Sequence, residues 1–169
     1  MMDIGALLEP EIPRLRRYAR ALMGDASRAD DLVEDCLCRA VRTIDLFWSG
    51  TDLRVWLFTL LRDQLAGSGR QVAHAMRATA IEDAAKAVSS PKHRFPALTL
   101  ENLRRALAGL PADQREVVLL VGLEGFRYDD VARILDVPVG TVRSRFSRGR
   151  NALHGVMTGD EKACSSVAA

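Results

Sequence analysis

Apolar side chains recur three or four positions apart through most of this chain, and that spacing limits its possible folds more than any other feature. A repeat of this kind places apolar residues along one side of an α-helix. The first example runs from Ile12 to Met23, with Pro13 near its start, where helices tolerate proline. No segment alternates between apolar and polar residues as an exposed β-strand would. The spacing therefore predicts an all-α fold.

Two further helices are expected in the first part of the chain. Gly24 and Asp25 should end the first helix, and Ser27 should cap the second. The buried face of the second helix is predicted to consist of Leu32, Val33, Cys36, Leu37, Ala40, Val41 and Ile44. Thr51 or Asp52 should cap the third helix after a break. Its apolar positions are Leu53, Trp56, Leu57, Leu60 and Leu61.

A change in composition then divides the chain into two predicted domains. Residues 72–97 are rich in alanine and end in SSPKHRFPA, which is typical of a flexible linker. The domains flank it at residues 9–71 and 98–157, and residues 158–169 are expected to be a disordered tail. The helices predicted in the second domain are Leu98–Leu110, Ala112–Leu123, Asp129–Leu135, and a last one from Gly140 or Thr141 to Val156.

Composition narrows the class of protein. The chain has 169 residues, of which 48% are apolar and 27% charged, with a net charge of +2, so a globular protein is expected. Three cysteines without a secretory signal favour a reducing cytoplasm. The longest apolar run, Val117–Leu123, is far shorter than the ~20 residues that a membrane span requires. We therefore expect a soluble, cytoplasmic protein.

The last two predicted helices have the form of a helix-turn-helix. A short helix is followed by a turn at Asp136-Val137-Pro138 and by a second helix with four arginines within eight positions. The apolar face of that second helix consists of Val142, Phe146, Gly149 and Leu153. Its other faces carry arginine and serine, which can bind phosphates and the edges of bases in duplex DNA. A solvated basic helix face is the alternative interpretation.

Positions along this helix are expected to differ in what they contact. The N-terminal part of such a helix usually reaches the bases, so the candidates for base contact are Thr141, Arg143 and Ser144. The flanks of the helix usually position the DNA backbone. The candidates for phosphate contact are Arg145, Arg148 and Arg150. Ser147 lies on the same outward face.

An acidic run, ADDLVEDCL, begins the second predicted helix of the first domain. Asp31, Glu34 and Asp35 lie on or near one side of it, beside Leu32. A docking face for a basic protein surface is one interpretation, and helix solvation with acids near a helix N-terminus is the other. Catalytic carboxylates or a metal site would need a pocket, partner groups or clustered histidines, none of which the sequence displays. No cofactor is therefore expected.

Two aromatic residues, Phe47 and Trp48, lie in the break before the third helix. Exposed aromatic rings can stack on unpaired bases of a nucleic acid. A loop that packs down on the core is the alternative for both residues. Trp56 belongs to the apolar stripe of the third helix and is expected in the core.

In combination, these segments resemble the bacterial extracytoplasmic-function (ECF) sigma factors of RNA polymerase, which belong to the sigma-70 family. The resemblance spans residues 12–157. The segments that carry it are DDLVEDCLCRAV, GTDLRVWLFTLL and LPADQREVVLLVGLEGFRYDDVARILDVPVGTVRSRFSRGRNAL. The last segment contains LPxxxRE, GxxYxxVA and VPxGTVRSRxxRGR in the family's order and spacing. The sequences GTDLRVWLFTLL and LLVGLEGF are similar to those of the ECF group that is tied to the general stress response of alphaproteobacteria.

The resemblance implies that the two domains are sigma domains 2 and 4. Core RNA polymerase would be bound through its β′ clamp helices and β flap, the former by Asp31, Leu32, Glu34 and Asp35. The −10 element of the promoter, with a flipped base, would be met by Phe47, Trp48, Ser49, Gly50, Thr51 and Asp63. The −35 element would be read by Arg143, Ser144, Arg145 and Arg148. An anti-sigma factor that wraps both domains is the implied regulator.

Three positions depart from the family pattern. Asp63 stands near a position where many members have asparagine, and an acid there would repel phosphate and change −10 specificity. Only Arg70 lies where the end of that helix often carries a basic cluster, which predicts weak or selective promoter opening. Arg127 replaces the usual capping serine before Tyr128, which puts one helix cap in doubt and adds a candidate phosphate contact.

A sigma factor is the leading hypothesis, and other classes stay open. A sigma-like mimic that titrates an anti-sigma factor would need no basic recognition helix, and such mimics carry a receiver domain that this chain has no room for. A helix-turn-helix transcriptional regulator with an effector-binding domain fits the acidic run and GTDLRVWLF poorly. An enzyme fits least, because the sequence has no nucleophile–base set, phosphate-binding glycine loop or metal constellation.

Overall fold

The structure, a computed structural model, describes residues 4–47, 52–67 and 100–158. Within these ranges every regular element is a helix and no strand occurs, so the predicted all-α fold is confirmed. We refer to residues 4–67 as the first half and to residues 100–158 as the second half. Several predicted features lie outside the described residues. They are the linker, Trp48–Thr51, Arg70 and nearly all of the tail.

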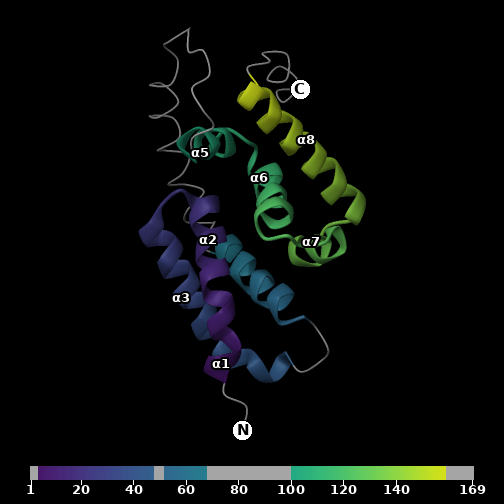
Figure 1. The fold of residues 1–169 in the computed structure, drawn as a ribbon. Coiled ribbons are helices and arrows are strands. Elements are labelled where there is room, and N and C mark those ends of the chain that lie inside the picture. The colour runs from purple at the N-terminus through teal and green to yellow at the C-terminus, as the bar shows by residue number, and fades with distance from the viewer. Residues whose placement is uncertain (1–3, 48–51, 68–99, 159–169) are drawn as a thin grey trace.

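The first half is a small bundle of helices (Figure 1). Its elements are α1 (Ile4–Leu8), the 3₁₀ turn η1 (Glu9–Glu11), α2 (Ile12–Met23), α3 (Ala26–Thr43), the 3₁₀ turn η2 (Ile44–Leu46), and a helix over residues 53–67. The long helices α2 and α3 pack against each other along their apolar stripes. The predicted third helix is thereby confirmed over residues 53–67.

Short polar signals set the ends of these helices. Gly24 closes α2 in a left-handed conformation, with φ of 72°, and its N–H donates to Arg20 O at 3.0 Å. Asp25, not Ser27, caps α3, because Asp25 has the extended backbone of a cap and its carboxylate accepts from Arg28 N at 3.1 Å. The prediction for Ser27 is wrong because that residue already lies inside the first helical turn. Asp52 Oδ1 accepts from Arg54 N at 2.9 Å and caps the 53–67 helix, one of the two predicted choices.

The second half consists of five helical elements. They are α5 (Leu100–Ala108), α6 (Ala112–Val118), the π-helical turn η3 (Leu119–Leu123), α7 (Tyr128–Leu135) and α8 (Val139–Thr158). The helix predicted over Ala112–Leu123 therefore widens after Val118, where Glu124 N donates to Leu119 O at 3.1 Å. Leu119 and Leu120 stay buried, whereas Leu123 is 39% exposed and Glu124 is buried instead.

The two halves share one hydrophobic core. The Phe58 ring of the first half meets the Phe126 ring of the second half edge to face, with centroids 4.9 Å apart. The Tyr18 ring also packs on Phe58, with centroids 5.2 Å apart. Figure 1 shows α6 and η3 resting against α2 and the 53–67 helix. Apolar burial thus joins segments that are far apart in the sequence.

The core of the first half contains a buried thiol, that of Cys36. Cys36 is fully buried on α3, and its Sγ lies 3.6 Å from Leu57 O. Burial raises the pKa of Cys36 to about 12, so the thiol stays protonated at neutral pH. The prediction that Cys36 acts as a small apolar residue is thereby supported.

Within the second half, α8 crosses α6 at a glycine. A Cβ atom on Gly149 would lie 2.6 Å from Val118 Cγ2, so a larger residue could not occupy this crossing without displacing its neighbour. Arg115 of α6 holds the end of α5 by donating to Ala108 O at 2.8 Å and to Leu110 O at 3.0 Å. The helices α5, α6 and α8 thus pack together within the second half. None of the described helices is long and apolar enough to cross a membrane.

Candidate nucleic-acid interface

The turn between α7 and α8 is built mainly from backbone hydrogen bonds. Asp136 closes α7 in the left-handed region, with φ of 52° and ψ of 51°. Val137 N then donates to Ala132 O at 3.1 Å, which is the bond pattern of a helix closed by a left-handed residue. Pro138 O accepts from Thr141 N at 2.9 Å and from Val142 N at 3.2 Å, so α8 begins at Val139, one residue before the earliest predicted start.

The apolar side of α8 docks as the spacing predicts. Val142 is fully buried, Gly149 is buried at the crossing with α6, and Phe146 is half-buried against the core. The Phe146 ring also packs on the Tyr128 ring of α7, with centroids 5.9 Å apart. The α7–turn–α8 unit therefore has the geometry of the predicted helix-turn-helix.

The opposite side of α8 carries the polar residues that the sequence places there. We call this the basic face; its exposed members are Arg143, Ser144, Ser147, Arg148 and Arg150. Thr141 is half-buried, and its carbonyl oxygen accepts from Ser144 Oγ at 3.0 Å. Arg148 donates to Ser144 O and Ser144 Oγ, both at 3.3 Å. The Arg143 guanidinium lies 6.0 Å from the centre of the Tyr128 ring.

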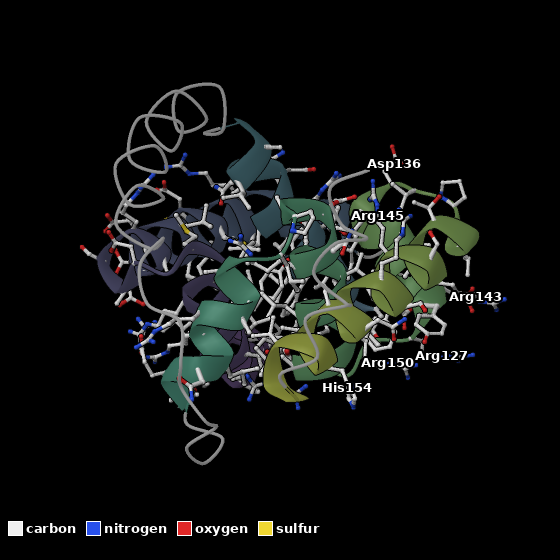
Figure 2. The ribbon with its side chains drawn as sticks, turned by 90° about the horizontal axis from the view of Figure 1, so that it is seen from above. Arg127, Asp136, Arg143, Arg145, Arg150 and His154 are labelled. Carbon is white, nitrogen blue, oxygen red and sulfur yellow. The ribbon has the colours of Figure 1, made fainter. Side chains whose placement is uncertain are left out.

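Arg145 differs from the other predicted phosphate contacts. Its Nε forms an ion pair with Asp113 Oδ2 of α6 at 3.0 Å, and its side chain is only 26% exposed. Figure 2 shows Arg145 on one side of α8, and Arg143 and Arg150 on the other. An arginine that already has an acid partner must give up that bond before it can bind a phosphate.

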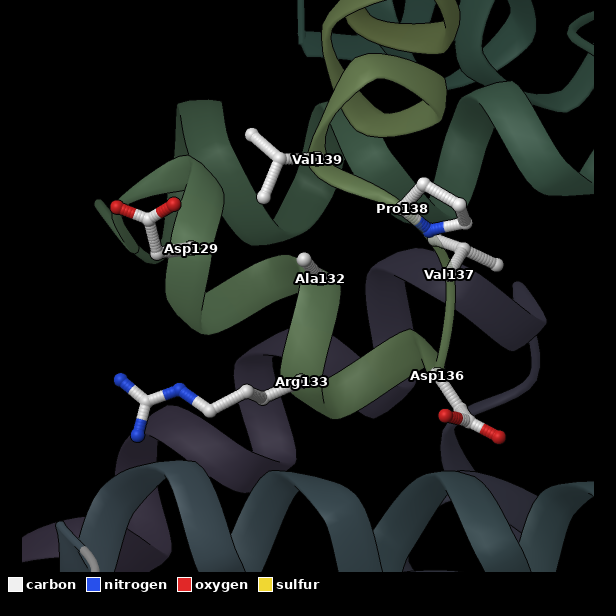
Figure 3. Close-up of a pocket in the computed structure, with 7 residues that line it drawn as sticks. All are labelled: Asp129, Ala132, Arg133, Asp136, Val137, Pro138 and Val139. Atoms are coloured by element: carbon white, nitrogen blue, oxygen red, sulfur yellow. The ribbon is translucent and has the colours of Figure 1, made fainter.

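A shallow hollow borders the turn (Figure 3). Its lining comes from α7, the turn and the first residue of α8, and consists of Asp129, Ala132, Arg133, Asp136, Val137, Pro138 and Val139. Arg133 is held by an ion pair with Asp130 one turn earlier. The described residues contain no cluster of His, Cys, Asp or Glu that could hold a metal ion.

The acidic side chains predicted on α3 are exposed together. Asp31, Glu34 and Asp35 all face solvent, whereas Leu32 beside them is 8% exposed and packs in the core. Asp30, in contrast, is paired within the protein. Arg20 of α2 donates a hydrogen bond to its carboxylate at 2.7 Å, and this hydrogen bond lowers the pKa of Asp30. The acidic run thus has three solvent-facing carboxylates that a partner could contact.

The residues predicted near the −10 element are described only in part. The Phe47 ring is half-buried and lies 5.3 Å from the Trp56 ring. This contact agrees with the alternative in which the loop packs down on the helical bundle. Trp56 itself is half-buried, not fully within the core. Asp63 is exposed on the 53–67 helix, and Trp48, Ser49, Gly50 and Thr51 lie outside the described residues.

Sequence reasoning missed a polar cluster between the halves. Glu124 follows η3, and its side chain has no exposed surface. Its carboxylate accepts from Arg17 Nε and Nη2 of α2, each at 2.9 Å, and these hydrogen bonds raise the pKa of Arg17. Arg54 Nη2 donates to the Glu124 backbone carbonyl and lies 3.3 Å from its Oε2. A buried acid is therefore paired by two arginines of the other half.

Arg54 also packs on aromatic rings at this point. Its guanidinium carbon lies 4.3 Å from the centre of the Phe126 ring and 6.0 Å from that of Phe58. A single charged residue in the run VGLEGF could have signalled the cluster, because an acid within apolar sequence needs a partner if it is buried. The sequence could not tell which arginine that partner would be.

A second acid of this interface is paired less well. Burial raises the pKa of Glu116 on α6, and its nearest arginine, Arg62, lies 4.0 Å away. We define the interface between the halves by these charged residues: Arg17, Arg54 and Arg62 from the first half, Glu116 and Glu124 from the second half.

Comparisons with known proteins agree with this arrangement. A family model for the sigma2 domain of PhyR matches residues 8–62, and one for sigma-70 region 4 matches residues 100–153. The ECF RNA polymerase sigma factor EcfG of Rhodopseudomonas palustris (strain TIE-1) is 42% identical over 150 residues, covering 86% of this chain and 80% of that protein. This chain belongs to the ECF RNA polymerase sigma factor family.

Other relatives of this sigma factor are more distant. The ECF sigma factor SigC of Mycobacterium tuberculosis (strain CDC 1551 / Oshkosh) is 34% identical, covering 79% of this chain and 72% of that protein. Among solved structures, the sigma factor RpoE from Bartonella quintana, crystallised with the anti-sigma factor NepR, is 34% identical with a TM-score of 0.75. That match covers 95% of this chain and all of the matched one.

Proposed function

We propose that this sigma factor brings core RNA polymerase to a subset of promoters in the cytoplasm, under the control of an anti-sigma factor. The observation that carries the proposal is the basic face of α8. Val142 and Gly149 are buried on one side of the helix, which leaves arginines and serines exposed on the other. A helix held in this way can enter the major groove of a duplex.

Within this proposal the predicted division of contacts is kept. Thr141, Arg143 and Ser144 contact bases of the −35 element, while Arg148 and Arg150 contact phosphates and Ser147 lies beside them. Arg145 contributes only after it separates from Asp113. Asp31, Glu34 and Asp35 dock on the polymerase, and Leu32 supports them from the core. The −10 element is met by Phe47, the 48–51 loop and Asp63.

Regulation by an anti-sigma factor is supported by the related structure from Bartonella quintana, in which a sigma factor is bound to NepR. The corresponding domain boundaries are 9–71 for sigma domain 2 and 98–157 for sigma domain 4. The matched family models fall inside these ranges apart from one residue, at residues 8–62 and 100–153.

Run-off transcription on genomic promoter DNA with purified core polymerase is the deciding test. A promoter-dependent transcript that appears only when this protein is added is the expected result. The main alternative is a mimic that titrates an anti-sigma factor, because the first half matches the sigma2 domain of PhyR and the PhyR of Bartonella quintana is an anti-anti-sigma factor. Tight binding to an anti-sigma protein without any transcript would favour that alternative.

The basic face is tested separately by two arginine substitutions. Arg143→Ala should weaken promoter binding by about 1–3 kcal/mol and relax the sequence preference at one −35 position, because it removes a base contact. Arg148→Ala should weaken all duplexes alike and reduce the salt dependence of binding, because it removes a phosphate contact. Unchanged binding by both variants, measured by fluorescence anisotropy of the holoenzyme, would contradict the assignment of α8.

The acidic face of α3 calls for a binding test of its own. Reversing the charge at Asp31 and Glu34 together should weaken the affinity for core polymerase, because a basic partner surface would then meet like charge. Both side chains are exposed, so the fold should tolerate the change. Core affinity equal to that of the wild type would show that the polymerase docks elsewhere.

A further inference from the structure

We propose that Arg127, at the N-terminal end of α7, is a further DNA-contacting residue, which binds a backbone phosphate beside the bases that α8 would read. The inference rests on the proposed function, because it places Arg127 against the same promoter duplex. It adds a contact from the first helix of the helix-turn-helix to those expected from the second.

The first observation concerns the position of Arg127 as a helix cap. Arg127 has extended backbone dihedrals, with φ of −73° and ψ of 154°, and its side chain makes no cap hydrogen bond. Serine, threonine, aspartate and asparagine are the residues that usually stabilise this position. Arginine therefore contributes nothing to the cap, and its side chain is exposed.

The second observation is where this side chain lies. Tyr128 follows Arg127 directly, and its ring packs on Phe146 of α8 and lies 6.0 Å from the Arg143 guanidinium. The start of α7 is thereby held against the middle of α8. Figure 2 shows Arg127 on the same side of α8 as Arg143 and Arg150, away from Arg145. A duplex that contacts Arg143 and Arg150 would have its backbone close to Arg127.

The third observation is that other arginines nearby are already paired. Arg133 binds Asp130, Arg145 binds Asp113, and Arg115 binds backbone carbonyls. Among the described residues, the side chains of Arg127, Arg143 and Arg150 have neither a hydrogen-bond nor an ion-pair partner. An unpaired guanidinium can offer its fork of N–H donors to phosphate oxygens without first losing another bond.

The two acids at the start of α7 add negative charge near Arg127, but neither forms an ion pair with it. Asp129 is exposed two residues after Arg127 and lines the hollow beside Val139, while Asp130 is held by Arg133 (Figure 3). Neither carboxylate contacts Arg127. Phosphate is favoured over a base because the first helix of a helix-turn-helix crosses the DNA backbone, whereas the second enters the groove.

The test compares Arg127→Ser with wild type in the holoenzyme, on a promoter duplex identified by run-off transcription and on a scrambled duplex. Loss of one phosphate contact should make the negative slope of log affinity against log salt concentration less steep by about 0.9, on both duplexes. If the variant and the wild type bind equally at 1 M salt, the variant should bind about eightfold more weakly than the wild type at 0.1 M salt. Serine should at the same time raise the melting temperature, because it supplies the missing cap.

Two matched variants keep the result specific. Arg127→Lys should restore most of the salt slope, because it keeps the charge. Arg133→Gln, which removes a paired arginine of the same helix, should leave the slope near the wild-type value. An unchanged slope in Arg127→Ser, an equal loss in Arg133→Gln, or a loss confined to the promoter duplex would each overturn the phosphate contact. Failure of the wild-type holoenzyme to select a promoter would instead overturn the proposed function itself.

Discussion

Two groups of arginines in this sigma factor have opposite environments. Arg17 and Arg54, in the first half, are bonded to the buried carboxylate of Glu124 across the interface between the halves. Arg127, Arg143 and Arg150, in the second half, face solvent with no acid bonded to them among the described residues. The same side chain thus holds the protein together in one place and is available to a ligand in the other.

A run of arginines in the sequence therefore does not by itself define a binding surface. What matters is whether an acid from another segment reaches each guanidinium. Arg145 lies within the run of α8 and would be grouped with its neighbours by sequence, but Asp113 of α6 pairs with it. Tertiary contacts therefore divide one basic run into available and occupied members.

The largest effect is expected from Glu124→Gln, which removes the charge that Arg17 and Arg54 share. Breaking a buried pair from one side is costly, and because the Arg17 side chain is half exposed, the free energy of unfolding should fall by about 3 kcal/mol, the lower end for such pairs. Urea denaturation followed by circular dichroism measures this loss, and small-angle scattering measures whether the halves separate.

The control for that variant is Glu101→Gln, which breaks the exposed pair with Arg105 one helical turn away. Such a pair contributes about 0.3 kcal/mol, so this variant should resemble the wild type. Equal stability of the two variants would show that apolar contacts such as Phe58 with Phe126 join the halves without help from Glu124.

Gly149→Ala should have the next largest effect. A methyl group 2.6 Å from Val118 Cγ2 overpacks the crossing of α6 and α8, and this cost outweighs the better helix propensity of alanine. We expect a net loss of about 1 kcal/mol in thermal unfolding. Gly140→Ala in the same helix has no atom within 4 Å of the new methyl group and should not destabilise the fold. If both substitutions behave alike, the close crossing does not hold the basic face in place.

Glu116→Gln is expected to act in the opposite direction to Glu124→Gln. Burial raises the pKa of Glu116, so at neutral pH its ionised form costs folding energy that a glutamine would avoid. Stability should rise by less than about 1 kcal/mol at pH 7. The gain should vanish as the pH falls below the ordinary range for glutamate, because both folded and unfolded forms are then protonated. A loss of stability at pH 7 would mean that Arg62 pairs with Glu116 more strongly than their 4.0 Å separation indicates.

The smallest effect is expected from Asp113→Asn. This change releases Arg145 from its partially exposed ion pair and adds a free cation beside the basic face. DNA affinity should rise by about twofold, in line with the modest strength of exposed pairs. Holoenzyme binding to duplex DNA, with Asp129→Asn as a control for net charge, separates release of Arg145 from a general charge effect. An equal gain in both variants would contradict a specific role for the pair.

Local sequence signals predicted much of the fold. The apolar spacing located the helices because a helix buries one side, and Gly24 and Asp52 marked helix ends through short-range bonds. Ser27 failed as a cap because several polar residues in a row compete for that role, and Asp25 has the required backbone. The π-helical turn at Leu119–Leu123 was not predicted, since its residues are apolar in either helical form.

Local sequence was enough to predict the helix-turn-helix and the side of α8 that faces outward, because both follow from spacing within one short segment. The packing of the helices is needed to show that Glu124 binds Arg17 and Arg54, that Asp113 pairs with Arg145, and that Arg127 lies on the same side of α8 as Arg143. Those contacts join residues from different helices. Their partners are selected by how the helices pack, and an ion pair carries no periodic signal along the chain from which that packing could be predicted.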